Sequence, residues 1–158
     1  MSRLRVLPRH LEAMERHAVA NYPEECCGVI LGRPIPDEPG AFLVERILPA
    51  ANERADSRHN RYIIPPEAVF AAYREAQTSN LDVLGYFHSH PDHPAVPSEF
   101  DREHAWPGLS YVIIAVAKGQ VAAVRSWRLN DDRESFFEEE IDNLSSPDRL
   151  KSRVLVEA

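Results

Sequence analysis

The chain has 158 residues, a formal net charge of −7 and a hydrophobic content of 44%. This length predicts one compact domain that buries about two thirds of the surface of the unfolded chain. The acidic balance, with no cluster of lysine or arginine, argues against a protein that binds nucleic acid. No apolar run is long enough to span a bilayer, and the N-terminal stretch MSRLRVLPRH lacks the apolar region of a signal peptide, so we expect no membrane association.

Hydrophobic periodicity and turn residues divide the chain into short strands and a few helices. The expected strands lie at 4–6, 26–31, 42–48, 62–64, 83–87, 111–116, 121–127 and 136–141, and the expected helices at 8–20, 65–78 and 98–105. Strands outnumber helices and mostly follow one another in hairpin order, which predicts an α+β fold with a mixed, mainly antiparallel sheet flanked by helices. We expect a single domain over residues 1–141 and a C-terminal tail over 142–158 that is either docked or mobile.

The two cysteines of the chain, Cys26 and Cys27, are adjacent. Adjacent cysteines do not form a disulfide framework, and reduced cysteines are typical of the cytosol, so we expect a cytoplasmic protein. On a strand the two side chains would point to opposite faces, and at most one of them could reach a given metal ion.

The segment His88-Ser89-His90-Pro91 directly follows the expected buried strand at 83–87. Residues two apart on a strand point to the same face, so His88 and His90 project together at its carboxyl end. Two imidazoles on a rigid backbone form half of a metal site. Considered alone, however, a His-x-His pair is explained more simply by one core histidine and one loop histidine.

Ser98 and Asp101 have the spacing of a capping box at the start of the expected helix 98–105. A structural cap alone would explain this pair. The cap is also compatible with a functional site, because a helix N-terminus can hold a carboxylate in a fixed orientation. With the two histidines, Asp101 would complete three nitrogen and oxygen ligands, and catalytic zinc typically has three protein ligands and a fourth position for water.

Taken together, the residues from His88 to Asp101 resemble the JAMM motif of the MPN-plus metalloproteases. That family also carries a glutamate in a Pro-x-Glu-x-Cys-Gly context, and this chain has Pro23-Glu24-Glu25-Cys26-Cys27-Gly28. The resemblance extends from about residue 11 to residue 127 and is strongest to small stand-alone bacterial members. It implies a three-layer α/β, cytidine-deaminase-like form of the expected fold.

The resemblance also implies a role for each motif residue. Zn²⁺ would be held by His88, His90 and Asp101, and the metal would lower the pKa of a water molecule toward about 7. Glu25 would accept the proton of this water and return it to the leaving amine. The Ser98 hydroxyl would stabilise the negative charge that develops on the scissile carbonyl oxygen.

The resemblance to the MPN-plus metalloproteases also implies a substrate class. Enzymes of that family cleave peptide or isopeptide bonds after the Gly-Gly tail of ubiquitin-like proteins. Its small bacterial members are similar to enzymes that process sulfur-carrier proteins. The loop 52–61 and the strand 62–64 are our candidates for contacts with such a tail. Two alternatives stay open: a catalytically inactive MPN scaffold that binds protein partners, and a zinc peptidase of small peptides. A zinc nucleoside deaminase is excluded, because that class needs a Pro-Cys-x-x-Cys signature after its His-x-Glu, and Pro-Cys-x-x-Cys does not occur in this chain.

Overall fold

The computed structural model describes residues 2–52 and 64–144. In chain order, these residues form β1 (Arg3–Val6), α1 (Pro8–Asn21), β2 (Cys27–Pro34), β3 (Ala41–Ala50), α2 (Pro66–Thr78), β4 (Asp82–Pro91), α3 (Glu99–His104), β5 (Ser110–Ala117), β6 (Gln120–Leu129) and β7 (Phe136–Asn143). Residues 53–61 of the expected loop at 52–61, residues 62 and 63 of the expected strand at 62–64 and most of the expected tail at 142–158 lie outside the described residues. The domain boundary after residue 141 stays a prediction, although β7 continues two residues beyond it.

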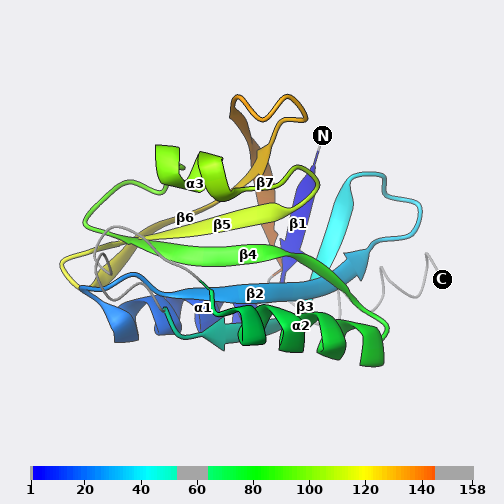
Figure 1. Cartoon of the computed structure of the whole chain (residues 1–158), viewed down its shortest axis with the longest axis horizontal. Helices are drawn as coiled ribbons and strands as arrows, with labels where there is room; N and C mark the ends of the chain where they lie inside the picture. The colour runs from blue at the N-terminus through cyan, green and yellow to red at the C-terminus, as the bar shows by residue number, and fades with distance from the viewer. Residues whose placement is uncertain (1, 53–63, 145–158) are drawn as a thin grey trace.

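The sheet closes into a barrel with the strand order β1-β3-β2-β4-β5-β6-β7. Closure depends on β1, which pairs in parallel with β3 on one side and with β7 on the other. Figure 1 shows β1, in dark blue, beside β7. The expected three-layer, cytidine-deaminase-like fold is therefore wrong. The middle layer of such a fold is an open sheet with two edge strands, whereas here β1 joins the two edges of the sheet. This short strand carries no local signal that it would pair twice.

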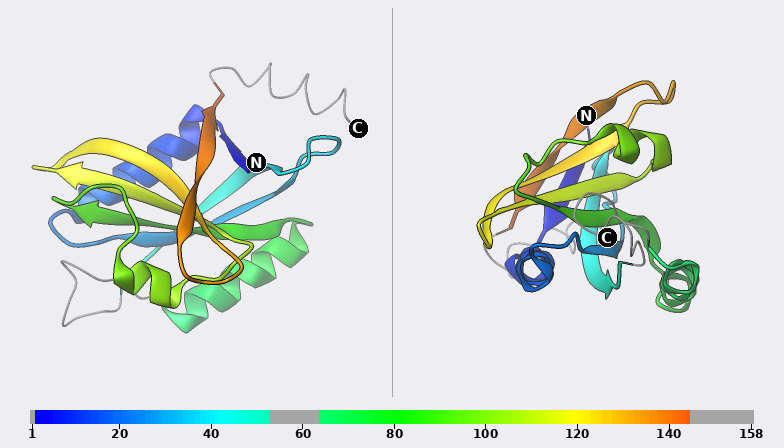
Figure 2. Two further views of the ribbon diagram at one scale, coloured as in Figure 1. Left: turned by 90° about the horizontal axis from the view of Figure 1, so that it is seen from above. Right: turned by 60° about the vertical axis from the view of Figure 1, so that its left-hand side comes forward.

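Helices α1 and α2 lie on either side of β2 and β3, as the right-hand view of Figure 2 shows. Ile30 of β2 belongs to the core cluster that α1 covers, whereas its neighbour Val29 packs against α2. Alternate side chains of β2 are thus buried on opposite sides, as the pleat of a strand requires. The helices contribute small or flexible buried side chains: Met14 and Ala18 from α1, and Ala72 and Ala76 from α2. None of the helices in the described ranges has the length and apolar character needed to cross a bilayer.

Strand β4 contains both histidines of the motif and has a neighbouring strand on each side. It pairs antiparallel with β2 and parallel with β5, and the register places His88 between Cys27 of β2 and Ile113 of β5. A strand with neighbours on both sides has its backbone N–H and C=O groups engaged, which makes it a rigid support for functional side chains. This position also explains why His88 is completely buried.

Gly85 marks a close approach between β4 and β5. It pairs with Ser110, and a Cβ atom at this glycine would collide with the Ser110 carbonyl oxygen. Because the obstacle is backbone, the two strands would have to separate, so Gly85→Ala should lower the free energy of unfolding by about 3 kcal/mol in urea titrations. Gly108→Ala is the matched control: Gly108 has a positive φ but open space around it, and we expect a loss of about 1 kcal/mol. Equal losses for the two variants would contradict the close approach.

Candidate metal centre

Strand β4 presents His88 and His90 on the same face, with their Nε2 atoms 3.2 Å apart. His88 is fully buried and His90 partly exposed. The Nδ1 atom of His90 lies 2.8 Å from the carbonyl oxygen of Pro94, which can only accept a hydrogen bond. Nδ1 of His90 is therefore the donor, and Nε2 of the neutral ring keeps its lone pair on the side that faces His88.

Asp101 reaches both histidines from α3. Its carboxylate oxygens lie 3.2 Å from Nε2 of His88 and 3.2 Å from Nε2 of His90. The capping box expected from the sequence is present as well: the Asp101 N–H donates to Ser98 Oγ at 3.1 Å, and the Ser98 N–H donates to the Asp101 carboxylate at 2.8 Å. The cap thus aims the carboxylate at the histidines. The Ser98 hydroxyl accepts in this pair and keeps its own proton available to donate.

These three side chains are the His–His–Asp trio of the site, and among the described residues they form the one group of His, Cys, Asp or Glu side chains placed to hold a metal ion. Tetrahedral zinc, with bonds of about 2.0–2.1 Å to nitrogen, holds its ligand atoms about 3.3 Å apart. The spacings of 3.2 Å match this value. Neither cysteine belongs to the trio: both are buried free thiols, and the Cys27 sulfur lies near the backbone carbonyl of Ala50 at the end of β3. The donor set therefore fits zinc.

The electrostatic environment favours the metal-binding protonation states of His88 and Asp101. Burial lowers the pKa of His88, which favours its neutral imidazole. Burial opposes the ionisation of Asp101, but the two histidines and the Ser98 N–H outweigh it, so the pKa of Asp101 falls below its ordinary value. A neutral imidazole and an ionised carboxylate are the forms that bind a divalent cation.

Glu25 lies where β2 reaches the histidines. The register pairs Cys27 with His88, so Glu25, two residues earlier, comes opposite His90 and on the same side of the sheet. Its side chain is buried, and burial, followed by the negative charge of Asp101, raises the pKa of Glu25 to about 9. A carboxyl with a raised pKa can hold a proton near neutrality, whereas a cation at the trio would favour its ionised form. This environment suits a group that both takes up and releases a proton.

Two cavities adjoin the trio. The first, which we call the Glu25 cavity, has a volume of about 500 Å³ and is lined by Glu25, His90, Pro91, His93, Pro94, Val96, Pro97 and Ser98. The second, the aromatic cavity, has a volume of about 210 Å³ and is lined by Ile64, Val69, Tyr86, Phe100, Asp101, His104, Trp106 and Tyr111. Because each cavity includes one member of the trio, a bound substrate could extend from the reacting bond in two directions.

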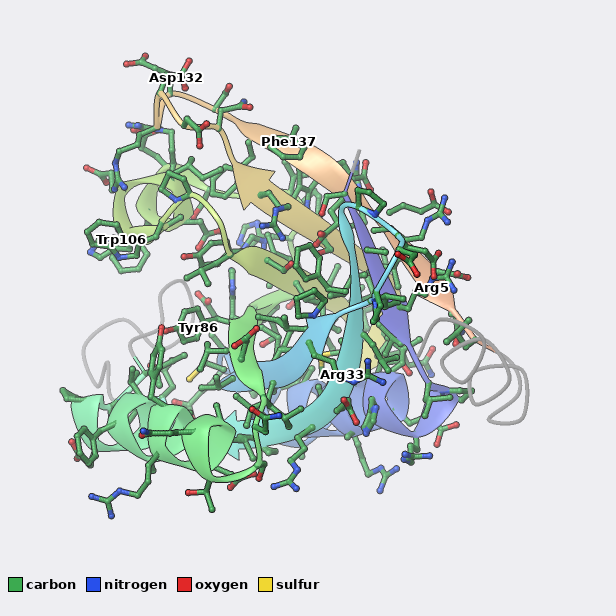
Figure 3. All side chains as sticks on the ribbon, turned by 90° about the vertical axis from the view of Figure 1, so that its right-hand side faces the viewer. Arg5, Arg33, Tyr86, Trp106, Asp132 and Phe137 are labelled. Atoms are coloured by element: carbon green, nitrogen blue, oxygen red, sulfur yellow. The ribbon has the colours of Figure 1, made fainter. Side chains whose placement is uncertain are left out.

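Trp106 is an exposed wall of the aromatic cavity, with 64% of its surface accessible. The guanidinium of Arg133 stacks on its ring at 4.9 Å, and the Trp106 backbone N–H donates to the Tyr111 hydroxyl at 2.8 Å. Figure 3 shows Trp106 projecting from the segment after α3 and Tyr86 projecting from β4. The sequence did not predict that these aromatic residues meet, because they come from separate segments and no spacing between them signals the contact.

Residues 7–130 match the family model described as prokaryotic homologs of the JAB domain. The chain belongs to this family. The resemblance to small stand-alone JAMM proteins is thereby confirmed. Relatives of this prokaryotic JAB protein include a desampylase of Haloferax volcanii, with 33% identity over 118 residues, which are 74% of this chain and 79% of the relative.

Two further similarities cover most of this JAB domain. The CysO-cysteine peptidase of Mycobacterium tuberculosis is 28% identical over 122 residues, which are 77% of this chain and 79% of that protein. A solution structure of a protein from Desulfitobacterium hafniense superposes with a TM-score of 0.76 and 30% sequence identity, covering 90% of this chain and 94% of the other. The match to the family model over residues 7–130 spans both motifs of the site.

Proposed function

We propose that this prokaryotic JAB protein is a zinc-dependent metallopeptidase that hydrolyses the peptide or isopeptide bond after the Gly-Gly tail of a ubiquitin-like or sulfur-carrier protein. The observation that carries the proposal is the trio of His88, His90 and Asp101 at 3.2 Å spacings, with Glu25 and His90 in the wall of one cavity. The relatives named desampylase and CysO-cysteine peptidase support this class of substrate.

In this proposal the trio holds Zn²⁺, which when bound acts as a Lewis acid that polarises the scissile carbonyl and makes a water molecule more acidic. Glu25 takes the proton of the attacking water and delivers it to the leaving nitrogen. The Ser98 hydroxyl donates a hydrogen bond to the developing oxyanion, and losing such a donor commonly costs about 10²-fold or more in rate. Asp101 does not transfer protons in this proposal, because its carboxylate faces both histidines and serves as a metal ligand.

We infer a direction for the bound substrate from the position of Glu25. Because Glu25 must reach the leaving nitrogen, the leaving group occupies the Glu25 cavity. The acyl side, which carries the Gly-Gly tail, then extends toward the aromatic cavity. Glycines keep the tail narrow beside the metal, and the aromatic walls suit an apolar side chain that precedes them.

This direction predicts a binding role for Trp106. We expect Trp106→Ala to raise KM about tenfold for a Gly-Gly-tailed protein substrate and to change kcat less than about twofold, because the ring lies beyond the reacting groups. Phe137→Ala is the matched control, since Phe137 is an exposed aromatic residue of β7 outside both cavities. Steady-state kinetics with both variants check this expectation, and an unchanged KM for Trp106→Ala would contradict the assigned direction.

The proposal itself is tested by incubating the zinc-loaded protein with a carrier protein conjugated through its Gly-Gly tail to a lysine or a cysteine. We expect intact mass spectrometry to detect the carrier with a free Gly-Gly carboxyl group, and the same reaction with a chelator present to yield none. Full zinc occupancy without cleavage of any conjugate would favour the inactive scaffold. Rapid cleavage of short peptides without preference for the conjugate would favour the small-peptide peptidase.

A further inference from the structure

The residue between the two histidines, Ser89, makes an unusual contact with the segment that carries Glu25. In an antiparallel ladder, the two residues of a hydrogen-bonded pair exchange two backbone hydrogen bonds. Here the Ser89 N–H donates to the Cys26 carbonyl oxygen at 3.1 Å, but the Cys26 N–H donates to the Ser89 side-chain oxygen at 2.8 Å. Both residues are buried, with 0% and 1% of their surfaces exposed. The serine hydroxyl thus takes the place of a backbone carbonyl at the point where β2 begins.

Ser89 and the catalytic side chains point to opposite faces of the sheet. His88 and His90 belong to the trio and point to one face of β4, so Ser89, which lies between them, points to the other face. Cys26 belongs to the core cluster on that side, whereas Glu25 precedes it and faces the trio. The Ser89 hydroxyl therefore touches neither the metal ligands nor the Glu25 cavity.

A second bond fixes the other end of the same segment. The Tyr22 hydroxyl donates to the Asp92 carboxylate at 2.7 Å, and Asp92 also accepts the Lys118 N–H at 3.0 Å. Asp92 directly follows the segment His88–Pro91, and Ser89 lies within that segment. The chain from Tyr22 to Cys26 is thus attached on both sides of Glu25, at one end to Asp92 directly after β4 and at the other end to Ser89 within β4. The attachment at Ser89 is the buried one.

We propose that Ser89 is a positioning residue for Glu25: its hydroxyl fixes the backbone next to Glu25 relative to the two histidines and so holds the carboxyl over the trio. Its catalytic consequence rests on the proposed function, but its effect on the backbone does not. A buried bond that replaces a ladder bond controls the direction in which the chain leaves the sheet. Misplacing a catalytic group by about 1 Å can reduce turnover about 10²-fold.

The effect on the backbone is tested without any substrate. Amide hydrogen exchange of the zinc-loaded protein should be about tenfold or more faster at Cys26 in Ser89→Ala, because the acceptor of that N–H is lost. The amides of Val29 and Ile30, further along β2, should change less than about twofold, and Ser89→Thr, which keeps a hydroxyl, should restore slow exchange at Cys26. Unchanged exchange at Cys26, or equal acceleration along the whole of β2, would overturn the proposal.

The catalytic consequence is tested with a double-mutant cycle. Ser89→Ala should keep one zinc per chain, leave KM within about twofold and lower kcat about 10²-fold, whereas in the Glu25→Gln background it should cause no further loss. Tyr22→Phe should lower kcat in the same direction by about threefold, since its bond is exposed. Additive losses, or loss of zinc from Ser89→Ala, would overturn the positioning role. A wild-type protein that cleaves no conjugate would refute the proposed function instead, and hydrogen exchange would still decide the role of Ser89.

Discussion

Glu25→Gln should lower kcat by about 10³-fold while the protein keeps one zinc per chain. Glutamine preserves the size of the side chain but cannot accept a proton from water, and general acid–base catalysis contributes about 10²–10⁴-fold. The variant leaves the trio of His88, His90 and Asp101 unchanged, so metal content should not fall. Single-turnover kinetics with a conjugated carrier protein and metal analysis of the same preparation check both parts.

Glu24→Gln is the matched control for this prediction. Glu24 has the same chemistry one residue earlier, but it lies in the bend before β2 and, unlike Glu25, does not line the Glu25 cavity. Its kcat should stay within about twofold of the wild-type value. If Glu24→Gln reduced turnover as much as Glu25→Gln, the assignment of proton transfer to Glu25 would be wrong.

The second large effect is expected for the buried histidine. His88→Ala should lose both zinc and turnover, since two remaining ligands hold the ion far more weakly than three and Asp101 loses one of its two imidazole partners. Turnover should fall by about 10³-fold or more. Metal analysis after dialysis, together with the cleavage assay, measures the two losses.

His88 is fully buried, so its replacement also leaves a cavity in the core. His90→Ala separates metal loss from unfolding, because the His90 ring is partly exposed and its removal disturbs the core less. Both variants should lack zinc, and His104→Ala, which removes an exposed imidazole from α3, should retain it. Retention of zinc by His88→Ala and His90→Ala would contradict the assigned ligands.

Much of the local structure could be predicted from the sequence because its signals are local. A proline at the first position and apolar residues at helical spacing predicted helices at 8–20 and 65–78, and the structure has α1 at Pro8–Asn21 and α2 at Pro66–Thr78. The capping box of α3 was likewise readable, since it depends on Ser98 and Asp101 alone. These helices are confirmed.

Long-range pairing could not be predicted from the same signals. The expected strand ended at Phe87, where the apolar run stops, but β4 continues to Pro91 because its parallel pairing with β5 extends as far as Val116. The closure of the barrel by β1 is a larger departure from expectation, since it depends on strands from opposite ends of the chain. Propensity carries no information about which distant strand a segment will join.

The site was predictable to the extent that its residues form motifs. Two short motifs indicated the trio and Glu25, and the structure brings the trio within contact distance. By contrast, the role of the Ser89 side chain depends on a hydrogen bond from the backbone N–H of Cys26. Almost every residue type carries a backbone N–H, so the sequence gives no sign of this bond. The aromatic cavity was equally unpredictable, because Tyr86, Trp106 and Tyr111 meet only in the folded chain.

The most direct test of the account is a crystal structure of the zinc-loaded protein with anomalous scattering measured at the zinc absorption edge. We predict one anomalous peak per chain, bonded to Nε2 of His88, Nε2 of His90 and a carboxylate oxygen of Asp101 at about 2.0–2.2 Å, with the Glu25 carboxyl group facing the fourth position. A peak at other residues, or no peak at full zinc loading, would contradict the account.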